Sequence, residues 1–246
     1  MLVPGFSMPY FIFDPTVDFL VKAGFRVLRY DLFGRGYSDR PHVAYNMGLF
    51  VKQLSELLDV LNFTQINLLG LSMGGAIASA FTADFPERIC KLVLIDPVGI
   101  QPAPLSWIYK AGILPGVSEL ILGLAGTERM VQGIASNFFD PRHIEIFQEQ
   151  YRTQMEYYGF KRAILSTLRN RMVGGFPKIY QQLGKLDMPI LLIWGQNDQI
   201  LPLEQSHDIL SAVSRAELHI MEDCGHIPQY EKPEEVNSIL AEFLNK

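Results

Sequence analysis

The segment Gly70-Leu71-Ser72-Met73-Gly74 combines a hydroxyl group with closely spaced glycines, a combination that can support nucleophilic catalysis. An apolar run at residues 66–71 leads into it, and a stretch compatible with a helix follows from Gly75. A strand that turns at once into a helix makes a tight, strained turn, in which the serine hydroxyl projects outward and the glycines let the two backbones approach. This context predicts that Ser72 is a nucleophile, rather than part of a glycine-rich turn that only packs.

A serine hydroxyl reacts when a base accepts its proton, and the base must be oriented by a third group. The sequence has five histidines: His42, His143, His207, His219 and His226. Only His226 lies in a loop directly after a predicted strand. Because sites in open α/β sheets form at the carboxyl ends of strands, we predict that His226 is the general base.

The orienting acid is expected at the end of another strand. Asp198 and Asp96 each follow an apolar run directly. Such aspartates are more often solvated or cap a helix. However, the chain order Ser72, Asp198, His226 is the order expected when the nucleophile lies on a Gly-x-Ser-x-Gly turn between a strand and a helix. Asp198 is therefore the predicted acid, and Asp96 is the second candidate.

Acyl transfer also needs two backbone N–H groups that stabilise the developing oxyanion. Met73 is expected to supply one, directly after the nucleophile. The loop Pro4-Gly5-Phe6 is expected to supply the other through Phe6, because proline has no N–H. The predicted wall of the substrate pocket includes Phe6, Trp107, Ile200 and Ile227.

Alternating strand and helix patterns position these side chains. Short apolar runs predict buried strands at residues 1–4, 26–30, 66–71, 91–95, 190–194 and 217–221. Amphipathic stretches predict helices at residues 12–23, 49–61, 75–85, 203–213 and 233–245. Such alternation is typical of βαβ units, so we expect an α/β fold with a mostly parallel sheet of about six strands flanked by helices.

The alternation stops between residues 99 and 187. This stretch predicts helical pieces broken by prolines and glycines, and it is rich in aromatic residues. We therefore expect a core domain formed by residues 1–99 and 187–246, with a helical cap inserted at residues 100–186. Some aromatic side chains of the cap are expected to line an apolar pocket, and the others to form the cap's own core.

The composition argues against several kinds of partner. The net charge is −5 and no basic run exceeds two residues, so we expect no nucleic-acid surface. No apolar run is long enough to span a bilayer, and the histidines and cysteines lack the spacing of zinc ligands. We therefore expect no transmembrane segment, no metal and no organic cofactor. Cys90 and Cys224 are expected to be free thiols in a reducing compartment, which favours a cytoplasmic location.

Five separated segments resemble the α/β-hydrolase superfamily, and the resemblance extends over the whole chain. They are Pro4-Gly5-Phe6, residues 31–38, Gly70-Leu71-Ser72-Met73-Gly74-Gly75, Trp194-Gly195-Gln196-Asn197-Asp198 and Gly225-His226. The similarity is greatest to the capped esterase, lipase and carbon–carbon bond hydrolase branches, and it implies an α/β-hydrolase fold. Residues 31–38 resemble a family loop that is mainly structural, so no catalytic role is expected for Asp31 or Arg35.

Two departures from the superfamily concern the start of the chain. Members usually have His-Gly where this chain has Pro4-Gly5, so the hydrogen bonds that support the oxyanion loop are expected to differ. Members also typically carry a leading β-hairpin, whereas Met1 already belongs to the first predicted strand. The hairpin is therefore expected to be missing, either in a naturally short form or because residues before Met1 are absent.

A serine at the turn distinguishes this chain from the haloalkane dehalogenase and epoxide hydrolase branches, which use aspartate there. The leading expectation is a carboxylesterase whose partners are small lipophilic esters of short to medium chain, cleaved through an acyl-enzyme on Ser72. The alternative is a carbon–carbon bond hydrolase of vinylogous diketones, although those relatives usually show asparagine where this chain has Leu71. Monoacylglycerol lipase or perhydrolase-like activity is also compatible. A non-catalytic hydrolase fold that binds a small ligand or a partner protein is the alternative from another class.

Overall fold

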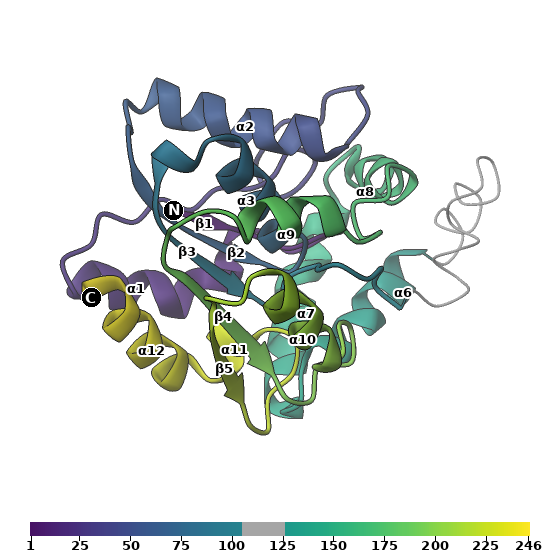
Figure 1. The fold of residues 1–246 in the computed structure, drawn as a ribbon. Helices are drawn as coiled ribbons and strands as arrows, with labels where there is room; N and C mark the ends of the chain where they lie inside the picture. The colour runs from purple at the N-terminus through teal and green to yellow at the C-terminus, as the bar shows by residue number, and fades with distance from the viewer. Residues whose placement is uncertain (105–125) are drawn as a thin grey trace.

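The computed structural model describes residues 1–104 and 126–246 (Figure 1). Within these residues, one sheet holds five parallel strands in the order β1-β2-β3-β4-β5. The strands are β1 (Leu2–Val3), β2 (Ile66–Leu71), β3 (Ile89–Ile95), β4 (Ile190–Gly195) and β5 (Glu217–Met221). All neighbouring pairs are parallel, so the carboxyl ends of the strands lie at one edge of the sheet. The predicted α/β class with a parallel sheet is confirmed.

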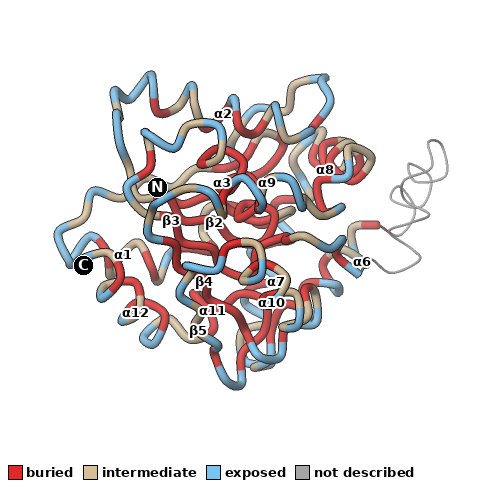
Figure 2. The backbone as a smooth tube through the Cα atoms, in the orientation of Figure 1, coloured by how far each residue is buried: buried red, intermediate tan, exposed pale blue. Residues whose placement is uncertain are grey.

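The central strands are hydrophobic along most of their length because helices cover both faces of the sheet. Every residue of β4 is buried, as are the last four residues of both β2 and β3. In β5, at the edge of the sheet, only the last residue is buried. Figure 2 shows that the buried backbone is concentrated in the sheet and in α3 (Met73–Asp84), the helix that leaves β2.

Two groups of helices cover the sheet. In the first group, α1 (Asp14–Lys22), α11 (Pro228–Glu231) and α12 (Pro233–Asn245) pack together. In the second, α3 contacts α2 (Met47–Val60) and α9 (Pro177–Leu183), and α9 contacts α10 (Glu204–Ala212). Figure 1 places α1 and α12 on one side of the sheet and α2 and α3 on the other. The helix predicted at residues 233–245 coincides with α12, which begins at a proline, as helices often do.

The strand predicted at residues 26–30 is wrong as a full strand. Only Arg29 forms a bridge, to Leu2, and Leu2 N donates to Leu28 O at 2.9 Å. The neighbouring strand β1 is two residues long, so it offers few backbone groups for a longer pairing. The described sheet therefore has five strands rather than about six.

Between β3 and β4 the described chain is helical, as predicted, and prolines and glycines separate the helices. These helices are α6 (Gly126–Gly133), α7 (Ile144–Met155), α8 (Phe160–Arg169) and α9. This stretch also contains short 3₁₀ turns at Ile134–Asn137 and Pro141–His143, and two further 3₁₀ turns occur earlier in the chain, at Tyr10–Phe13 and Pro86–Arg88. Aromatic side chains of α7 and α8, including Phe147 and Phe160, are fully buried. The division of the chain into a core and a cap at residues 100–186 stays a prediction.

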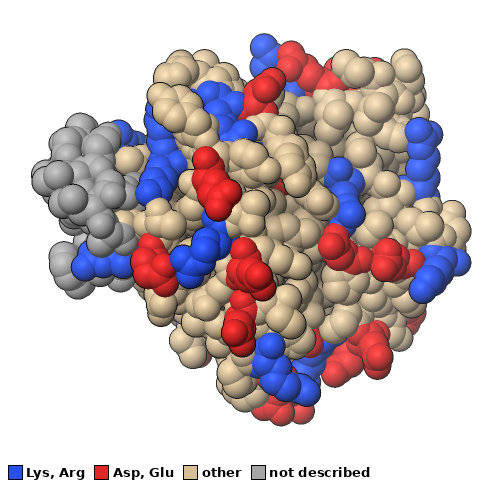
Figure 3. All heavy atoms as spheres, turned by 180° about the vertical axis from the view of Figure 1, so that it is seen from behind, with Lys and Arg blue, Asp and Glu red and all other residues tan. Residues whose placement is uncertain are grey.

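Charged side chains of both signs are mixed over the face of the molecule that Figure 3 shows, which lies behind the view of Figure 1. Among residues 1–104 and 126–246, no helix combines the length and the apolar character needed to cross a membrane. Cys90 is an exposed free thiol and Cys224 is a buried one.

Candidate active site

Ser72 occupies the turn between β2 and α3. Its backbone has φ 55° and ψ −122°, which residues other than glycine rarely adopt, so the turn is strained in the way the sequence context predicts. A Cβ atom on Gly70 would lie 2.4 Å from Gly74 O, and one on Gly74 would lie 2.3 Å from Val3 O. These contacts require glycine at both positions, because β1, β2 and α3 approach too closely for a side chain. Ser72 N also donates to Ile95 O at 2.9 Å, which ties the turn to β3.

The loop after β1 lies against Ser72. A Cβ atom on Gly5 would be 3.3 Å from Ser72 Cβ and 3.8 Å from its Oγ. Phe6 follows and lines the same cavity as Ser72. Met73 begins α3, and the first N–H groups of a helix have no partner within it. The two predicted oxyanion donors therefore belong to the segments that border Ser72.

His226 and Asp198 form a buried hydrogen-bonded pair at the carboxyl ends of β5 and β4. The distance from His226 Nδ1 to Asp198 Oδ2 is 2.6 Å, and the side chains are 4% and 0% exposed. The other carboxylate oxygen, Oδ1, accepts N–H groups from Ile200 at 2.7 Å and Leu201 at 2.9 Å. A carboxylate at Nδ1 favours the tautomer that carries its proton there, which leaves His226 Nε2 free to act as a base.

Asp96 lies in the same cluster but has different partners. Its Oδ1 accepts the Gly195 N–H at 2.9 Å, and among the described residues its Oδ2 has no hydrogen-bond partner. Ligand atoms of Asp96, Asp198 and His226 all lie within 4.8 Å of one another, a spacing that could hold a metal ion. Because the oxygens of Asp198 already accept three hydrogen bonds, we assign no metal to this cluster. Burial and the nearby Asp198 raise the pKa of Asp96 well above its ordinary value.

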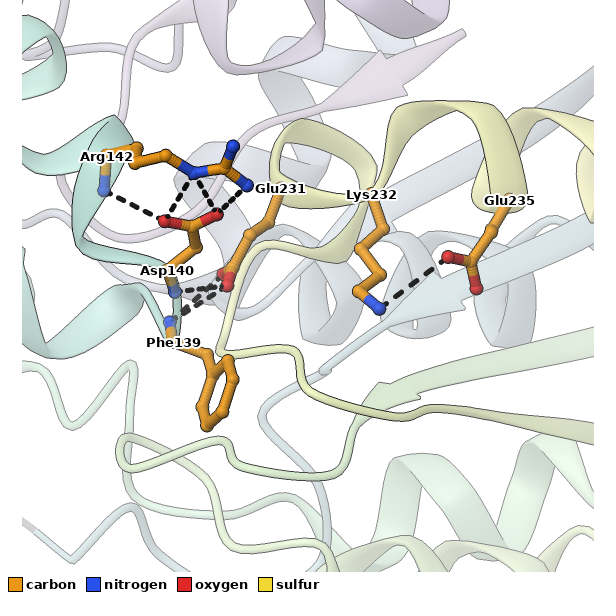
Figure 4. A network of polar contacts seen from close by, with 6 residues as sticks. All are labelled: Phe139, Asp140, Arg142, Glu231, Lys232 and Glu235. Atoms are coloured by element: carbon orange, nitrogen blue, oxygen red, sulfur yellow. Dashed lines mark hydrogen bonds and ion pairs between the residues drawn. The ribbon is translucent and has the colours of Figure 1, made fainter.

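Glu231, in α11, was not predicted from the sequence, yet it holds the loop that carries His226. Its carboxylate is buried and accepts N–H groups from Phe139 at 3.0 Å, Asp140 at 2.7 Å and Gly225 at 3.2 Å. Figure 4 shows Glu231 pointing at the backbone of Phe139 and Asp140. In addition, His226 N donates to Asn137 O at 2.8 Å. Residues 137–140, from the end of the 3₁₀ turn Ile134–Asn137 to the start of the turn Pro141–His143, therefore hold the loop of His226. No local pattern distinguishes Glu231 from the exposed glutamates that follow it.

A cavity of about 340 Å³ opens beside these residues. Ser72 and His226 line it, together with three of the four side chains predicted for the pocket: Phe6, Ile200 and Ile227. The fourth, Trp107, lies outside the described residues. The chain between β3 and β4 adds Met130, Ile134, Tyr151 and Leu168 from its helices and Val173 from the turn after α8. None of the described lining residues is a lysine, arginine, aspartate or glutamate.

Comparison with known proteins identifies the family. The pattern of the Alpha/beta hydrolase family matches residues 1–239. The chain therefore belongs to this family, and its fold is the α/β-hydrolase fold. The resemblance to the α/β-hydrolase superfamily, predicted from five segments of the sequence, is confirmed.

Two solved structures and one relative illustrate the range of similar proteins. A 2-hydroxy-6-oxononadienedioate/2-hydroxy-6-oxononatrienedioate hydrolase from Klebsiella pneumoniae subsp. pneumoniae is 30% identical over 241 residues, which cover 94% of this chain and 81% of the relative. The structure of a meta-cleavage product hydrolase from Pseudomonas fluorescens IP01 superimposes with a TM-score of 0.84 at 24% identity, over 99% of this chain and 89% of that one. The structure of an esterase from Exiguobacterium antarcticum superimposes with a TM-score of 0.83 at 19% identity, over 100% of this chain and 91% of that one. At these identities the two structures establish the fold alone.

Proposed function

We propose that this protein is a serine hydrolase that cleaves a carbon–carbon bond next to a ketone in a vinylogous diketone. The observation that carries the proposal is the similarity, over 94% of the chain, to hydrolases named for 2-hydroxy-6-oxo dienedioates. The arrangement of Ser72, His226 and Asp198 supports it, because Ser72 and His226 line one cavity and Asp198 is hydrogen-bonded to His226, as a nucleophile, a base and an orienting acid require. The sequence alone favoured ester hydrolysis, and the relatives shift that preference to its alternative.

The proposed reaction begins at Ser72. His226 Nε2 accepts the proton of the Ser72 hydroxyl as its oxygen attacks the ketone carbon, and Asp198 stabilises the imidazolium through Nδ1–H. The carbonyl oxygen becomes an oxyanion, which the N–H groups of Phe6 and Met73 would stabilise. These roles need no metal or organic cofactor.

Collapse of the tetrahedral intermediate breaks the carbon–carbon bond. The electron pair of that bond passes to a carbon conjugated with the second carbonyl, and the imidazolium of His226 supplies its proton. The acyl group remains on Ser72. His226 then deprotonates a water molecule, which attacks the acyl-enzyme and releases the acid. One water molecule is consumed, and Ser72 is regenerated.

Carboxylic ester hydrolysis is the second candidate, and two observations favour it. Leu71 stands where carbon–carbon bond hydrolases usually have asparagine. The described cavity wall also carries no lysine or arginine that could bind a carboxylate. The same steps then apply, with an alkoxide in place of the carbanion as the leaving group. On either reading, the described part of the wall, which carries no Lys, Arg, Asp or Glu, favours a substrate whose acyl arm is apolar rather than a second carboxylate.

One assay compares the two reactions. Purified protein is given 2-hydroxy-6-oxo-6-phenylhexa-2,4-dienoate, its analogue with a carboxylate on the acyl arm, and p-nitrophenyl esters of graded acyl length. We expect the phenyl dienoate to have a kcat/KM at least about 100-fold above the esters and about 10-fold above the carboxylate analogue. Ser72→Ala is the matched control and should abolish every activity.

Each other outcome has a distinct meaning. Turnover of esters without the dienoates would replace the first proposal by the second. If the protein turns over none of these substrates and Ser72 does not react with a fluorophosphonate, both proposed activities are contradicted. The remaining reading is a non-catalytic binding protein.

A further inference from the structure

Arg35 is a fully buried cation that no carboxylate of the described residues pairs with. Each of its three nitrogens donates to an uncharged polar group. Nε donates to Phe6 O at 2.8 Å, Nη1 to Phe33 O at 3.1 Å and Nη2 to Thr167 Oγ1 at 2.9 Å. The rings of Phe6 and Phe50 lie 5.7 and 5.5 Å from the guanidinium carbon.

Stability does not explain an arginine at this place. A buried charge without an opposite charge is unfavourable, and apolar side chains of similar volume often replace buried ions without loss of stability. The surroundings do act on the charge, because burial lowers the pKa of Arg35 to about 10. The group still carries its proton at neutral pH. The geometry of its hydrogen bonds is therefore the feature that only arginine supplies.

We propose that Arg35 is a positioning residue for the oxyanion hole and that Thr167 of α8 holds Arg35 in place. This inference rests on the proposed function, in which the N–H of Phe6 stabilises the oxyanion. The loop after β1 has no regular secondary structure, and its Pro4 has no N–H with which to anchor it. The bond from Arg35 to Phe6 O ties residue 6 directly to the rest of the protein.

Helix α8 can support Arg35 because it packs closely on the segment around it. A Cβ atom on Gly34 would lie 2.4 Å from Ala163 Cβ, so the helix touches the backbone next to Arg35. Thr167 is itself fixed, because its hydroxyl donates to Ala163 O at 2.8 Å while it accepts from Arg35. The next residue, Leu168, lines the cavity. The helix that contacts the substrate space is thus also the helix that positions the oxyanion donor.

The test uses four variants of the full chain: Arg35→Met, Arg35→Lys, Thr167→Val and Ser166→Ala. Ser166→Ala is the matched control, because Ser166 is the neighbour of Thr167 in α8 and accepts the Tyr45 N–H at 3.1 Å, whereas the hydrogen bonds of Arg35 go to Phe6, Phe33 and Thr167. Each variant is titrated with a fluorophosphonate, so that rates refer to intact sites. We measure kcat and KM for a p-nitrophenyl ester, and the affinities for a trifluoromethyl ketone and for the matching alcohol.

An oxyanion role predicts a specific pattern. For both Arg35 variants, kcat should fall about 10- to 100-fold, with KM within about threefold. Affinity for the trifluoromethyl ketone, which forms an oxyanion on Ser72, should fall by the same factor, whereas affinity for the alcohol should not change. Thr167→Val should show the same pattern at about three- to tenfold. Ser166→Ala should match the wild type.

Three results would overturn the inference. If Arg35→Met keeps the kcat and the trifluoromethyl ketone affinity of the wild type, Arg35 does not position the oxyanion hole, and the proposed function is unaffected. A loss that disappears after correction for titrated sites would reduce Arg35 to a structural residue. If the wild type has no Ser72-dependent turnover, the proposed function is wrong and this inference with it. Should the Arg35 variants not fold, equal values for Thr167→Val and Ser166→Ala would decide against it.

Discussion

The carboxyl groups of Asp96 and Asp198 lie together at the ends of β3 and β4, and only Asp198 is bonded to His226. The two differ in the hydrogen bonds that they accept. Asp198 accepts two backbone N–H groups besides Nδ1 of His226, whereas Asp96 accepts one, from Gly195. Two carboxylates in a buried cluster repel each other, and the one with fewer donors is the one that protonates. Asp96 is thus expected to be neutral beside the charged partner of His226.

This difference predicts unequal effects of two isosteric substitutions. Asp198→Asn should lower kcat about 10³- to 10⁴-fold, because an amide favours the wrong histidine tautomer. Asp96→Asn should retain kcat within about tenfold, since an amide resembles the protonated acid and asparagine tolerates the positive φ of this residue. Steady-state kinetics of both variants with the same substrate measure the effects. Equal losses in the two variants would mean that the acids share the role.

The raised pKa of Asp96 also predicts a pH-dependent stability. A carboxyl whose pKa is raised by folding contributes stability that is present below its unfolded pKa of about 4 and is lost as the pH rises through the folded pKa. Asp96→Asn cannot titrate. The free energy of unfolding of Asp96→Asn, relative to the wild type, should therefore increase as the pH rises above about 4.

Urea unfolding at several pH values measures this difference in stability. Asp18→Asn, at an exposed position of α1, is the control for the same change of side chain at the surface. A difference for Asp96→Asn that is constant, or that decreases with pH, would contradict a protonated Asp96.

Glu231 should be important for both stability and activity. Glu231→Gln places an amide NH₂ among backbone donors, so at least one buried N–H loses its acceptor, and the free energy of unfolding should fall by about 1 to 3 kcal/mol. Because the loop of His226 is then less well held, kcat should fall about tenfold.

The neighbouring Glu235 offers a matched control. It pairs with Lys232 at 3.6 Å (Figure 4). Its side chain is 61% exposed, so Glu235→Gln should change stability by no more than about 0.5 kcal/mol. Urea unfolding and steady-state kinetics of the two variants give the comparison. Similar behaviour of both would show that the buried Glu231 has no special role.

Gly74 should not tolerate a side chain. The Cβ of Gly74→Ala would lie 2.3 Å from Val3 O and 2.4 Å from Pro4 O, so β1 and the loop after it must move. We expect a loss of about 3 kcal/mol or more in the free energy of unfolding, together with a large loss of kcat. Gly48→Ala in α2 is the control, because its Cβ meets only Asn46 Oδ1 at 3.5 Å. It should be neutral or stabilise by up to about 1 kcal/mol, as thermal or urea unfolding would reveal.

The fold class and the candidate site residues of this protein can be predicted from local patterns in its sequence. The alternation of apolar runs and amphipathic stretches predicts the α/β class, because periodicity follows from which faces of an element are covered. Ser72 is identifiable from the glycines and the strand beside it, and its observed φ of 55° is the local consequence of that turn. Asp198 and His226 follow from their positions after strands, since the carboxyl ends of parallel strands meet at one edge.

Tertiary structure decided what depends on distant parts of the chain. Residues 26–30 have the composition of a strand, but a two-residue neighbour permits one bridge. Glu231 and Arg35 look like ordinary charged residues in the sequence, and they are buried because of contacts with Phe139 and Thr167, which lie 92 and 132 residues away. A charged side chain is normally solvated, and only the fold can surround it with the donors or acceptors that let it stay inside. The reacting groups are thus local features, while the residues that hold them in position are products of the packed structure.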